Sequence, residues 1–245
     1  MIYRMQCVIL AGGLGTRLRP ATDAIPKALI PVRGRPFADY QLAWLARQKV
    51  AEVVYCIGYR GAQIAAHVGD GRRFGLAVRY VDEGDDLKGT AGALRLAFDA
   101  GLLAEAFFVL YGDSYLPIPF APVFDAFAAS GRPALMTVMR NEHRWDRGNV
   151  IFTPPMVALY DKRADADTLR RMTHIDYGLS VVSRDLIAAR VGRGEKADLA
   201  DLFRELSRAG ELAGFEVAQR FYEVGSPAGI ADFARYLAQG ASPPP

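Results

Sequence analysis

The stretch QCVILAGGLGTRLRPATDAIPKALIPV, residues 6–32, decides the fold. Its first residues, 6–10, form an apolar run typical of a short buried strand, and they lead into a turn that contains Gly12, Gly13 and Gly15. Glycines allow a tight turn and expose backbone N–H groups to phosphate oxygens, because no Cβ blocks the approach. The stretch therefore predicts a strand that ends in a phosphate-binding loop.

Cationic side chains follow the glycine turn. Thr16, Arg17 and Arg19 come first, and Lys27 follows a proline further along. An arginine can bind two phosphate oxygens at once, whereas a lysine acts as a compact point charge. A glycine turn alone is most often an ordinary tight turn, but together with these cations it favours a triphosphate site. The loop is neither a Rossmann fingerprint nor a Walker loop, because GxGxxG fails after Gly15 and no Gly-Lys-Ser/Thr follows.

Short apolar runs alternate with segments of helical spacing through the first half of the chain. We expect strands at 6–10, 52–57, 76–81 and 106–111, and helices at 36–49, 62–68 and 90–100. This order predicts an α/β fold, a doubly wound, mostly parallel mixed sheet of Rossmann-like type with helices on both faces. Ligands bind beyond the carboxyl ends of such strands, so the turns at Gly12 and Gly112 should face one crevice.

The second half of the chain is less regular. We expect strands at 133–140, 177–182 and 214–222, two strands within 149–160, a short helix or mobile loop at 164–174, and helices at 199–209 and 227–239. We interpret residues 1–240 as a single domain with two halves, about 1–115 and about 116–240. Residues 241–245 are expected to form a flexible tail.

Composition narrows the class of protein. The chain has 245 residues, 51% of them hydrophobic, enough for a medium-sized domain with a buried core. A net charge of +3 is too small to indicate nucleic-acid binding. Cys7 and Cys56 lie in apolar runs and are expected to be reduced core residues. The N-terminus lacks a signal-peptide layout, and no apolar run approaches the ~20 residues that span a membrane, so we expect a cytoplasmic protein without membrane contact.

A second motif, Tyr111-Gly112-Asp113-Ser114, places a carboxylate at the end of a predicted buried strand. Mg²⁺ prefers oxygen ligands, so Asp113 is a candidate magnesium ligand. An aspartate that caps the following turn explains this motif slightly better when it is considered alone. The neighbouring phosphate-binding loop favours the metal interpretation.

These motifs resemble the sugar-phosphate nucleotidyltransferase family. Its signature is a glycine-rich turn, Gly-Thr-Arg-Leu-Arg-Pro, and then Pro-Lys-x-Leu-x-Pro-Val, and residues 12–20 and 26–32 match it almost without a gap. The resemblance implies a glycosyltransferase-A-type nucleotidyltransferase fold with a nucleotide-binding first half and a sugar-phosphate-binding second half. It also implies that Arg17 holds the triphosphate, that Lys27 stabilises charge on the attacked phosphate, and that Asp113 binds Mg²⁺.

The resemblance extends to further nucleotide-binding and metal residues. The family's second metal ligand is usually an aspartate in a late Asp-x-Gly-x-Pro segment, where this chain has Glu223. Residues 89–93 resemble the family's nucleoside-pocket motif, although Thr90 could simply cap a helix. Glu83 could accept both guanine N1–H and the 2-amino group, but related enzymes that use UTP are also acidic here. The predicted nucleotide-binding residues are Leu10, Ala11, Gly12, Gly13, Gly15, Thr16, Arg17, Glu83, Gly89, Thr90 and Gly112.

A sugar-phosphate site is implied by two later pairs. Asp161-Lys162 resembles the family's Glu-Lys pair, in which the acid meets sugar hydroxyls and the lysine meets the phosphate. Asp176 and Gly178 occupy the places of the family's Asn-x-Gly. Both acids differ from the usual residue. A surface salt bridge is an almost equally good explanation of Asp161 and Lys162.

The implied reaction joins a nucleoside triphosphate to a sugar 1-phosphate and releases pyrophosphate, with Mg²⁺ as cofactor. The best match is the short bacterial type that uses GTP with heptose or mannose 1-phosphate. A uridylyltransferase acting on a hexose or amino-sugar 1-phosphate remains open, as do a cytidylyltransferase acting on a non-sugar phosphate and a catalytically silent nucleotide-sugar-binding subunit. We expect a monomer or homodimer.

Overall fold

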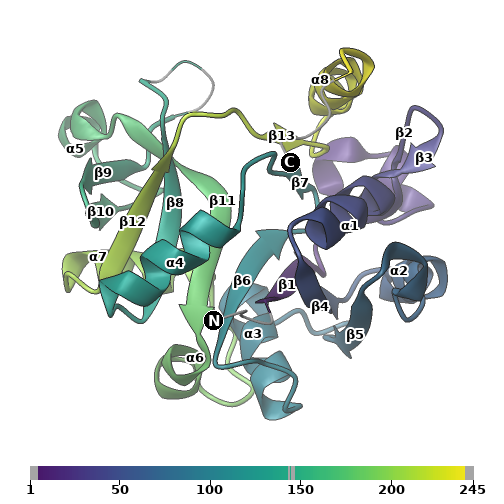
Figure 1. Ribbon diagram of the computed structural model, residues 1–245, viewed down its shortest axis with the longest axis horizontal. Helices are drawn as coiled ribbons and strands as arrows, with labels where there is room; N and C mark the ends of the chain where they lie inside the picture. The colour runs from purple at the N-terminus through teal and green to yellow at the C-terminus, as the bar shows by residue number, and fades with distance from the viewer. Residues whose placement is uncertain (1–4, 143, 145–146, 241–245) are drawn as a thin grey trace.

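The computed structural model describes residues 5–142, 144 and 147–240 (Figure 1). A nine-stranded sheet runs through it in the order β5-β4-β1-β6-β11-β8-β12-β10-β9. Its strands are β1 (Met5–Ala11), β4 (Val50–Ile57), β5 (Ala77–Asp82), β6 (Ala106–Tyr111), β8 (Ala134–Arg140), β9 (Val150–Thr153), β10 (Met156–Tyr160), β11 (His174–Ser183) and β12 (Leu212–Val217). One sheet therefore joins the two halves of the chain.

Strands β5, β4, β1 and β6 are mutually parallel, as expected. Along β1, Cys7 and Ile9 face one hydrophobic core and Val8 faces the other, which is the two-residue period of a strand buried on both faces. Both predicted core cysteines, Cys7 and Cys56, are buried and free. Such strands are exposed mainly at their ends, where the glycine-containing turns at Gly12 and Gly112 follow.

Helices cover both faces of the sheet. One face is covered by α1 (Phe37–Arg47), α2 (Gly61–Val68), α4 (Ala121–Ser130) and α8 (Pro227–Ala238), and the other by α3 (Gly89–Asp99), α6 (Arg184–Arg190) and α7 (Leu199–Arg208). Helix α5 (Ala166–Arg171) lies in the polar 164–174 segment. The arrangement is the doubly wound α/β architecture expected from the sequence.

The second half contains the antiparallel part of the sheet. Strand β11 runs antiparallel to both β6 and β8, while β12 is parallel to β8. The strand expected at 214–222 is divided: β12 ends at Val217, and β13 (Tyr222–Glu223) pairs instead with β7 (Ser114–Tyr115). That short pair brings the late Glu223 segment to the end of β6.

Two helices were not expected from the sequence. Helix α4 is apolar around most of its surface, so it shows no amphipathic stripe, and its early Pro122 is tolerated in a first turn. Helix α6 is only seven residues long and begins at a Ser183 cap, whose hydroxyl accepts the Leu186 N–H. A further short pair joins β2 (Pro31–Val32) to β3 (Arg35–Pro36).

The tail predicted at 241–245 lies outside the described residues. Within the described part of the chain, no helix has the length and apolar character needed to cross a membrane.

Candidate functional site

The glycine loop after β1 folds back on a buried threonine. Gly15 has a φ of 64°, a left-handed conformation that favours glycine, and it precedes the 3₁₀ turn Thr16–Leu18. The Thr22 hydroxyl donates to the Gly15 carbonyl at 2.9 Å, and a Cβ on Gly15 would lie 3.0 Å from the Thr22 methyl. The loop is therefore held in one shape by a short-range contact that the sequence pattern does not reveal.

The ends of β1 and β6 lie in direct contact. Leu10 pairs with Tyr111, and the Gly112 N–H donates to the Leu10 carbonyl at 2.9 Å. A Cβ on Gly112 would lie 2.9 Å from the Cβ of Ala11, so only glycine permits this approach. The two glycine-containing turns thus face one crevice, as expected from a parallel sheet.

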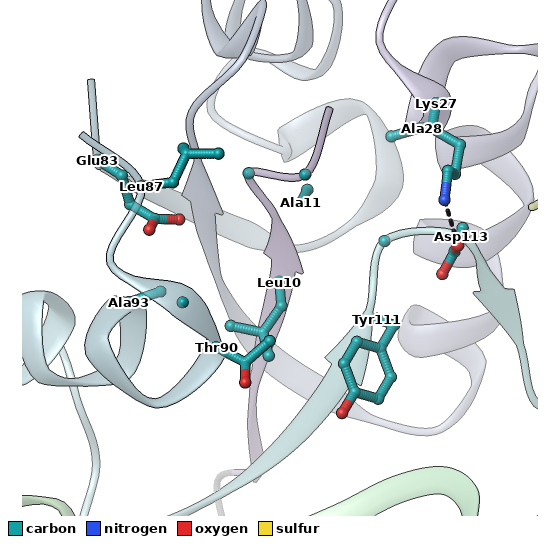
Figure 2. A pocket seen from close by; sticks show the side chains of 14 residues that line it. Leu10, Ala11, Lys27, Ala28, Glu83, Leu87, Thr90, Ala93, Tyr111 and Asp113 are labelled. Atoms are coloured by element: carbon teal, nitrogen blue, oxygen red, sulfur yellow. Dashed lines mark hydrogen bonds and ion pairs between the residues drawn. The ribbon is translucent and has the colours of Figure 1, made fainter. Parts of the chain in front are cut away.

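Two of the three predicted catalytic side chains, Lys27 and Asp113, meet at this crevice. The Lys27 ammonium lies 2.8 Å from Asp113 Oδ2, and both side chains are about four-fifths buried (Figure 2). Gly225 links them to Arg17, because a Cβ at Gly225 would lie 3.2 Å from Arg17 Nη2 and 3.5 Å from Asp113 Oδ2. Residues from three distant parts of the sequence therefore form one charged cluster.

A first cavity of about 250 Å³ opens beside this cluster, and we call it the nucleotide cavity. Gly15, Thr16 and Arg17 are absent from its wall, since they lie further along the loop. Its lining is Leu10, Ala11, Gly12, Gly13, Lys27, Ala28, Glu83, Leu87, Gly89, Thr90, Ala93, Tyr111, Gly112 and Asp113. Most of the predicted nucleotide-binding residues are thus brought together, alongside an apolar wall that the sequence analysis did not identify.

Glu83 lines the nucleotide cavity and contacts the backbone at two places. Its Oε2 accepts the Lys88 N–H at 2.8 Å, while Oε1 lies so close to Gly12 that a Cβ there would come within 2.4 Å of it. Burial raises the pKa of the Glu83 carboxyl, and the Lys88 hydrogen bond partly opposes that increase. One carboxylate oxygen is thus engaged by the backbone before any ligand binds.

Thr90 does not cap its own helix. Its hydroxyl donates to Asp198 Oδ1 at 2.6 Å and accepts the Leu199 N–H at 2.7 Å, so it stabilises the start of α7. In turn the Ala197 carbonyl accepts the N–H groups of Ala91 and Gly92 at the start of α3. This seam between α3 and the 197–199 segment fixes the start of α3, where Gly89 and Thr90 line the nucleotide cavity.

A second cavity of about 330 Å³, here called the acceptor cavity, lies next to the first. Tyr111 lines both. The other lining residues are Ser114, Arg147, Gly148, Asn149, Lys162, Ile175, Asp176, Tyr177, Gly178, Phe221 and Glu223. Lys162, Asp176 and Gly178, predicted for the sugar phosphate, therefore lie together.

Asp161 is the exception among the predicted sugar-phosphate residues, because it does not line the acceptor cavity. Its Oδ1 accepts the Arg163 N–H at 2.8 Å and its Oδ2 lies 3.3 Å from Arg208 Nη2. The side chain is thereby engaged by a turn and a surface arginine. Asp161 thus forms a salt bridge with Arg208 and not with Lys162, which lies in the cavity wall.

Asp176 is the most constrained acid of the acceptor cavity. Its Oδ1 accepts the Gly178 N–H at 3.0 Å, and the Tyr160 hydroxyl donates to Oδ2 at 3.3 Å. Its own N–H donates to Asn149 Oδ1 at 2.8 Å. Burial raises the pKa of the Asp176 carboxyl, while the Lys162 charge and these hydrogen bonds lower it. A carboxylate so placed presents its remaining lone pairs to a ligand.

Asp113 and Glu223 are brought together by the short β7–β13 pair. Glu223 lies opposite Ser114, and the Val224 N–H donates to the Asp113 carbonyl at 2.9 Å. Magnesium at nucleotide sites is usually held by one or two carboxylates, with water and substrate phosphates completing the octahedron. Within the described residues no cluster of three or more His, Cys, Asp and Glu side chains could hold a metal. Asp113 lines the first cavity and Glu223 the second, so these carboxylates could hold a cation between the two sites that phosphate oxygens also coordinate.

Sequence reasoning missed several residues of the site. Tyr111 stood inside a recognised motif, but only its neighbours were selected. Gln41 on α1 donates to the carbonyls of Tyr111 and Ser114 at 2.9 and 2.8 Å, and nothing in a helical pattern signals such a long-range contact. Arg147 and Asn149 lie in an irregular segment without a motif.

Comparisons with known proteins agree with this geometry. Residues 6–149 match the nucleotidyl transferase family. A mannose-1-phosphate guanylyltransferase of Mycobacterium tuberculosis is 28% identical over 249 aligned positions, which cover 99% of this chain and 67% of that protein. A mannose-1-phosphate guanyltransferase of Neurospora crassa is 28% identical, covering 91% of this chain and 61% of that protein. A UDP-glucose pyrophosphorylase solved with UDP-glucose superposes with a TM-score of 0.78 at 14% identity, covering 97% of this chain and all of that chain.

The chain therefore belongs to the nucleotidyl transferase family. The family, the enzyme class and the Rossmann-like fold predicted from the sequence are confirmed. The chain spans about two thirds or less of the length of the curated relatives described above.

Proposed function

We propose that this protein transfers a nucleotidyl group from a nucleoside triphosphate to a sugar 1-phosphate, releasing pyrophosphate and forming a nucleotide-sugar. The main support for this proposal is the arrangement of two cavities that share Tyr111, with the Lys27–Asp113 ion pair on the wall of the first. A reaction between two phosphorylated molecules needs two adjoining sites and cations where they meet. The two adjoining cavities, with Lys27 on the wall of the first and Lys162 on the wall of the second, support this requirement.

The chemistry needs no protein nucleophile. A sugar 1-phosphate oxygen is already an anion, and it attacks the α-phosphorus as pyrophosphate departs. The residues therefore act by positioning the two substrates and by stabilising charge that develops in the transition state. Gly12 and Gly13 line the nucleotide cavity, where backbone N–H groups of such a turn would donate to phosphate oxygens.

Charge neutralisation is assigned to Arg17 and Lys27. Lys27 already lies against Asp113, so a bound triphosphate would compete with that carboxylate for the ammonium group. Arg17 approaches the same carboxylate from the other side of Gly225. Asp113 and Glu223 would hold Mg²⁺, which neutralises phosphate charge when it is bound.

For the substrates, we propose GTP with mannose 1-phosphate or a heptose 1-phosphate. Two relatives named as guanylyltransferases of mannose 1-phosphate align with most of this chain. The Glu83 carboxylate in the nucleotide cavity supports guanine, because it can accept from both N1–H and the 2-amino group. Lys162 and Asp176 in the acceptor cavity suit a phosphate and sugar hydroxyls respectively.

The test is a pyrophosphate-release assay with Mg²⁺. GTP, UTP, CTP, ATP and dTTP are each paired with mannose, heptose, glucose and N-acetylglucosamine 1-phosphates and with phosphocholine. We expect GTP with mannose or heptose 1-phosphate to give the highest kcat/KM. Release with UTP or CTP only would contradict the guanine assignment. If no pair reacts while GTP still raises the melting temperature, the protein is a silent nucleotide-binding subunit, and the proposed activity is wrong.

A further inference from the structure

Tyr111 occupies an unusual place for a residue with no assigned role. It ends β6 and is the residue common to both cavity walls. Its backbone is fixed from two sides: its Cα pairs with Leu10 on β1, and the buried Gln41 donates to its carbonyl at 2.9 Å. Tyr111 therefore lies where the two cavities adjoin, on a backbone held by β1 and Gln41.

The Tyr111 hydroxyl points away from the Lys27–Asp113 pair (Figure 2). Burial raises the pKa of Tyr111, and Asp176 of the acceptor cavity is the largest charged contributor to that increase, followed by Asp198. Tyr160, which donates to Asp176, has its pKa raised by the same carboxylate and by Tyr111. Tyr111 and Asp176 thus line the acceptor cavity together, and the Tyr160 hydroxyl donates to the same carboxylate.

We infer that Tyr111 is a specificity-determining residue for the acceptor, and that it selects a polyhydroxylated sugar phosphate over phosphocholine. This inference rests on the proposed function. Tyr111 and Asp176 line the acceptor cavity together with Lys162, the proposed phosphate-binding residue.

The selection follows from hydrogen-bonding capacity. A neutral phenol both donates and accepts, and a carboxylate accepts only. Sugar hydroxyls can satisfy both groups at once, whereas a trimethylammonium group offers no N–H or O–H donor. A site built to hydrogen-bond a hydroxyl discriminates strongly against an analogue that lacks it, because its own polar groups are then left unpaired.

The experiment compares Tyr111→Phe with Tyr55→Phe. Both changes delete one phenolic oxygen from a buried tyrosine, but Tyr55 lies in the core of β4 and its hydroxyl has no hydrogen-bond partner among the described residues. With GTP and mannose 1-phosphate, we expect Tyr111→Phe to raise the KM for mannose 1-phosphate about tenfold, the equivalent of one hydrogen bond of about 1.4 kcal/mol. The KM for GTP should change less than twofold, and Tyr55→Phe should match the wild type.

Deoxy analogues of mannose 1-phosphate extend the test. In the wild type, one of the 2-, 3- or 4-deoxy analogues should lose about tenfold in kcat/KM, and Tyr111→Phe should lose nothing further with that analogue. Equal KM values for Tyr111→Phe and Tyr55→Phe, or a rise in the KM for GTP instead, would overturn the inference and leave the proposed function standing. A wild type inactive with every pair would overturn the proposed function itself. Melting temperatures confirm that each variant is folded.

Discussion

The nucleotide cavity and the acceptor cavity are built from the same sheet in different ways. The first lies where parallel strands β1 and β6 end, and its wall comes largely from short contiguous segments around Gly12, Gly89 and Gly112. The second lies beside antiparallel β11, and its residues come from two short runs, 147–149 and 175–178, and from five single positions. Glycine turns that end parallel strands leave a motif in the sequence, whereas an irregular segment and the middle of a strand leave a weaker one.

The two cavities also hold charge differently. In the nucleotide cavity the Asp113 carboxylate is paired directly with Lys27 at 2.8 Å. In the acceptor cavity Asp176 is held by N–H and O–H donors, and Lys162 acts on it as a neighbouring charge. The first arrangement suits a ligand that displaces a partner, and the second suits a ligand that adds hydrogen bonds to a preformed acceptor.

Removing Lys27 should have the largest effect and would test the role assigned to the nucleotide cavity. Lys27→Ala should reduce kcat/KM for GTP by a factor of about 10²–10³, the effect typical of losing one preorganised electrostatic group. Pyrophosphate release measures it. Arg72→Ala is the matched control, because Arg72 is exposed and paired only with Asp70 on the surface. Wild-type turnover in folded Lys27→Ala would refute the assigned role.

The acceptor cavity predicts unequal effects for two adjacent residues. Lys162→Ala should raise the KM for the sugar 1-phosphate by about ten- to thirtyfold, since it removes a charge-assisted hydrogen bond to phosphate. Asp161→Ala should change that KM less than threefold, because Asp161 faces Arg163 and Arg208 and not the cavity. Steady-state kinetics with varied acceptor distinguish them. The reverse order would restore the family-based role of Asp161.

A pair of glycine variants measures the close packing of the nucleotide cavity. Gly12→Ala should lower the free energy of unfolding by about 1–3 kcal/mol, because its Cβ would lie 2.4 Å from Glu83 Oε1. Gly13→Ala should cost less than about 0.5 kcal/mol, since nothing within 4 Å would meet its Cβ. Urea denaturation measures both. Equal losses would show that loop strain, and not contact with Glu83, sets the cost.

Asp176→Asn should have the smallest effect, visible as a pH dependence. Burial raises the Asp176 pKa above its ordinary value of 3.8, so its ionisation weakens the fold as pH rises through the folded-state pKa. Asn removes that titration. The variant should therefore melt higher than the wild type near neutral pH, and the difference should vanish below about pH 4. Melting curves across pH 3–8 check this, and a lower melting temperature at neutral pH would contradict it.

The sequence predicted the parallel half of the fold and the first cavity well. Apolar runs bounded by glycine located β1, β4, β5 and β6, and the turns at Gly12 and Gly112 lie in contact as expected. The second half was predicted less completely. Helix α4 has no polar face to mark it, and the β7–β13 pair joins residues more than a hundred positions apart.

The same limit applies to single side chains. Lys27 and Asp113 could be selected because each lies in a motif, and the structure places them in one ion pair. Asp161 was selected by resemblance, but it pairs with Arg208, which is distant in the sequence, and it does not line the cavity. Tyr111 and Gln41 were not selected, because their roles depend on tertiary contacts. Tyr111 lines both cavities, and Gln41 donates to its carbonyl.

The seam between α3 and Ala197 bears on how this fold can be recombined. The first N–H groups of α3 have their acceptor on a segment encoded about a hundred residues later, and a Cβ on Gly89 would lie 2.5 Å from that same carbonyl. A chimera that joined the first 115 residues of this chain to the remainder of a relative would inherit the two sides of the seam from different parents. Successful gene exchange within the family should therefore carry the 89–92 and 197–199 segments together.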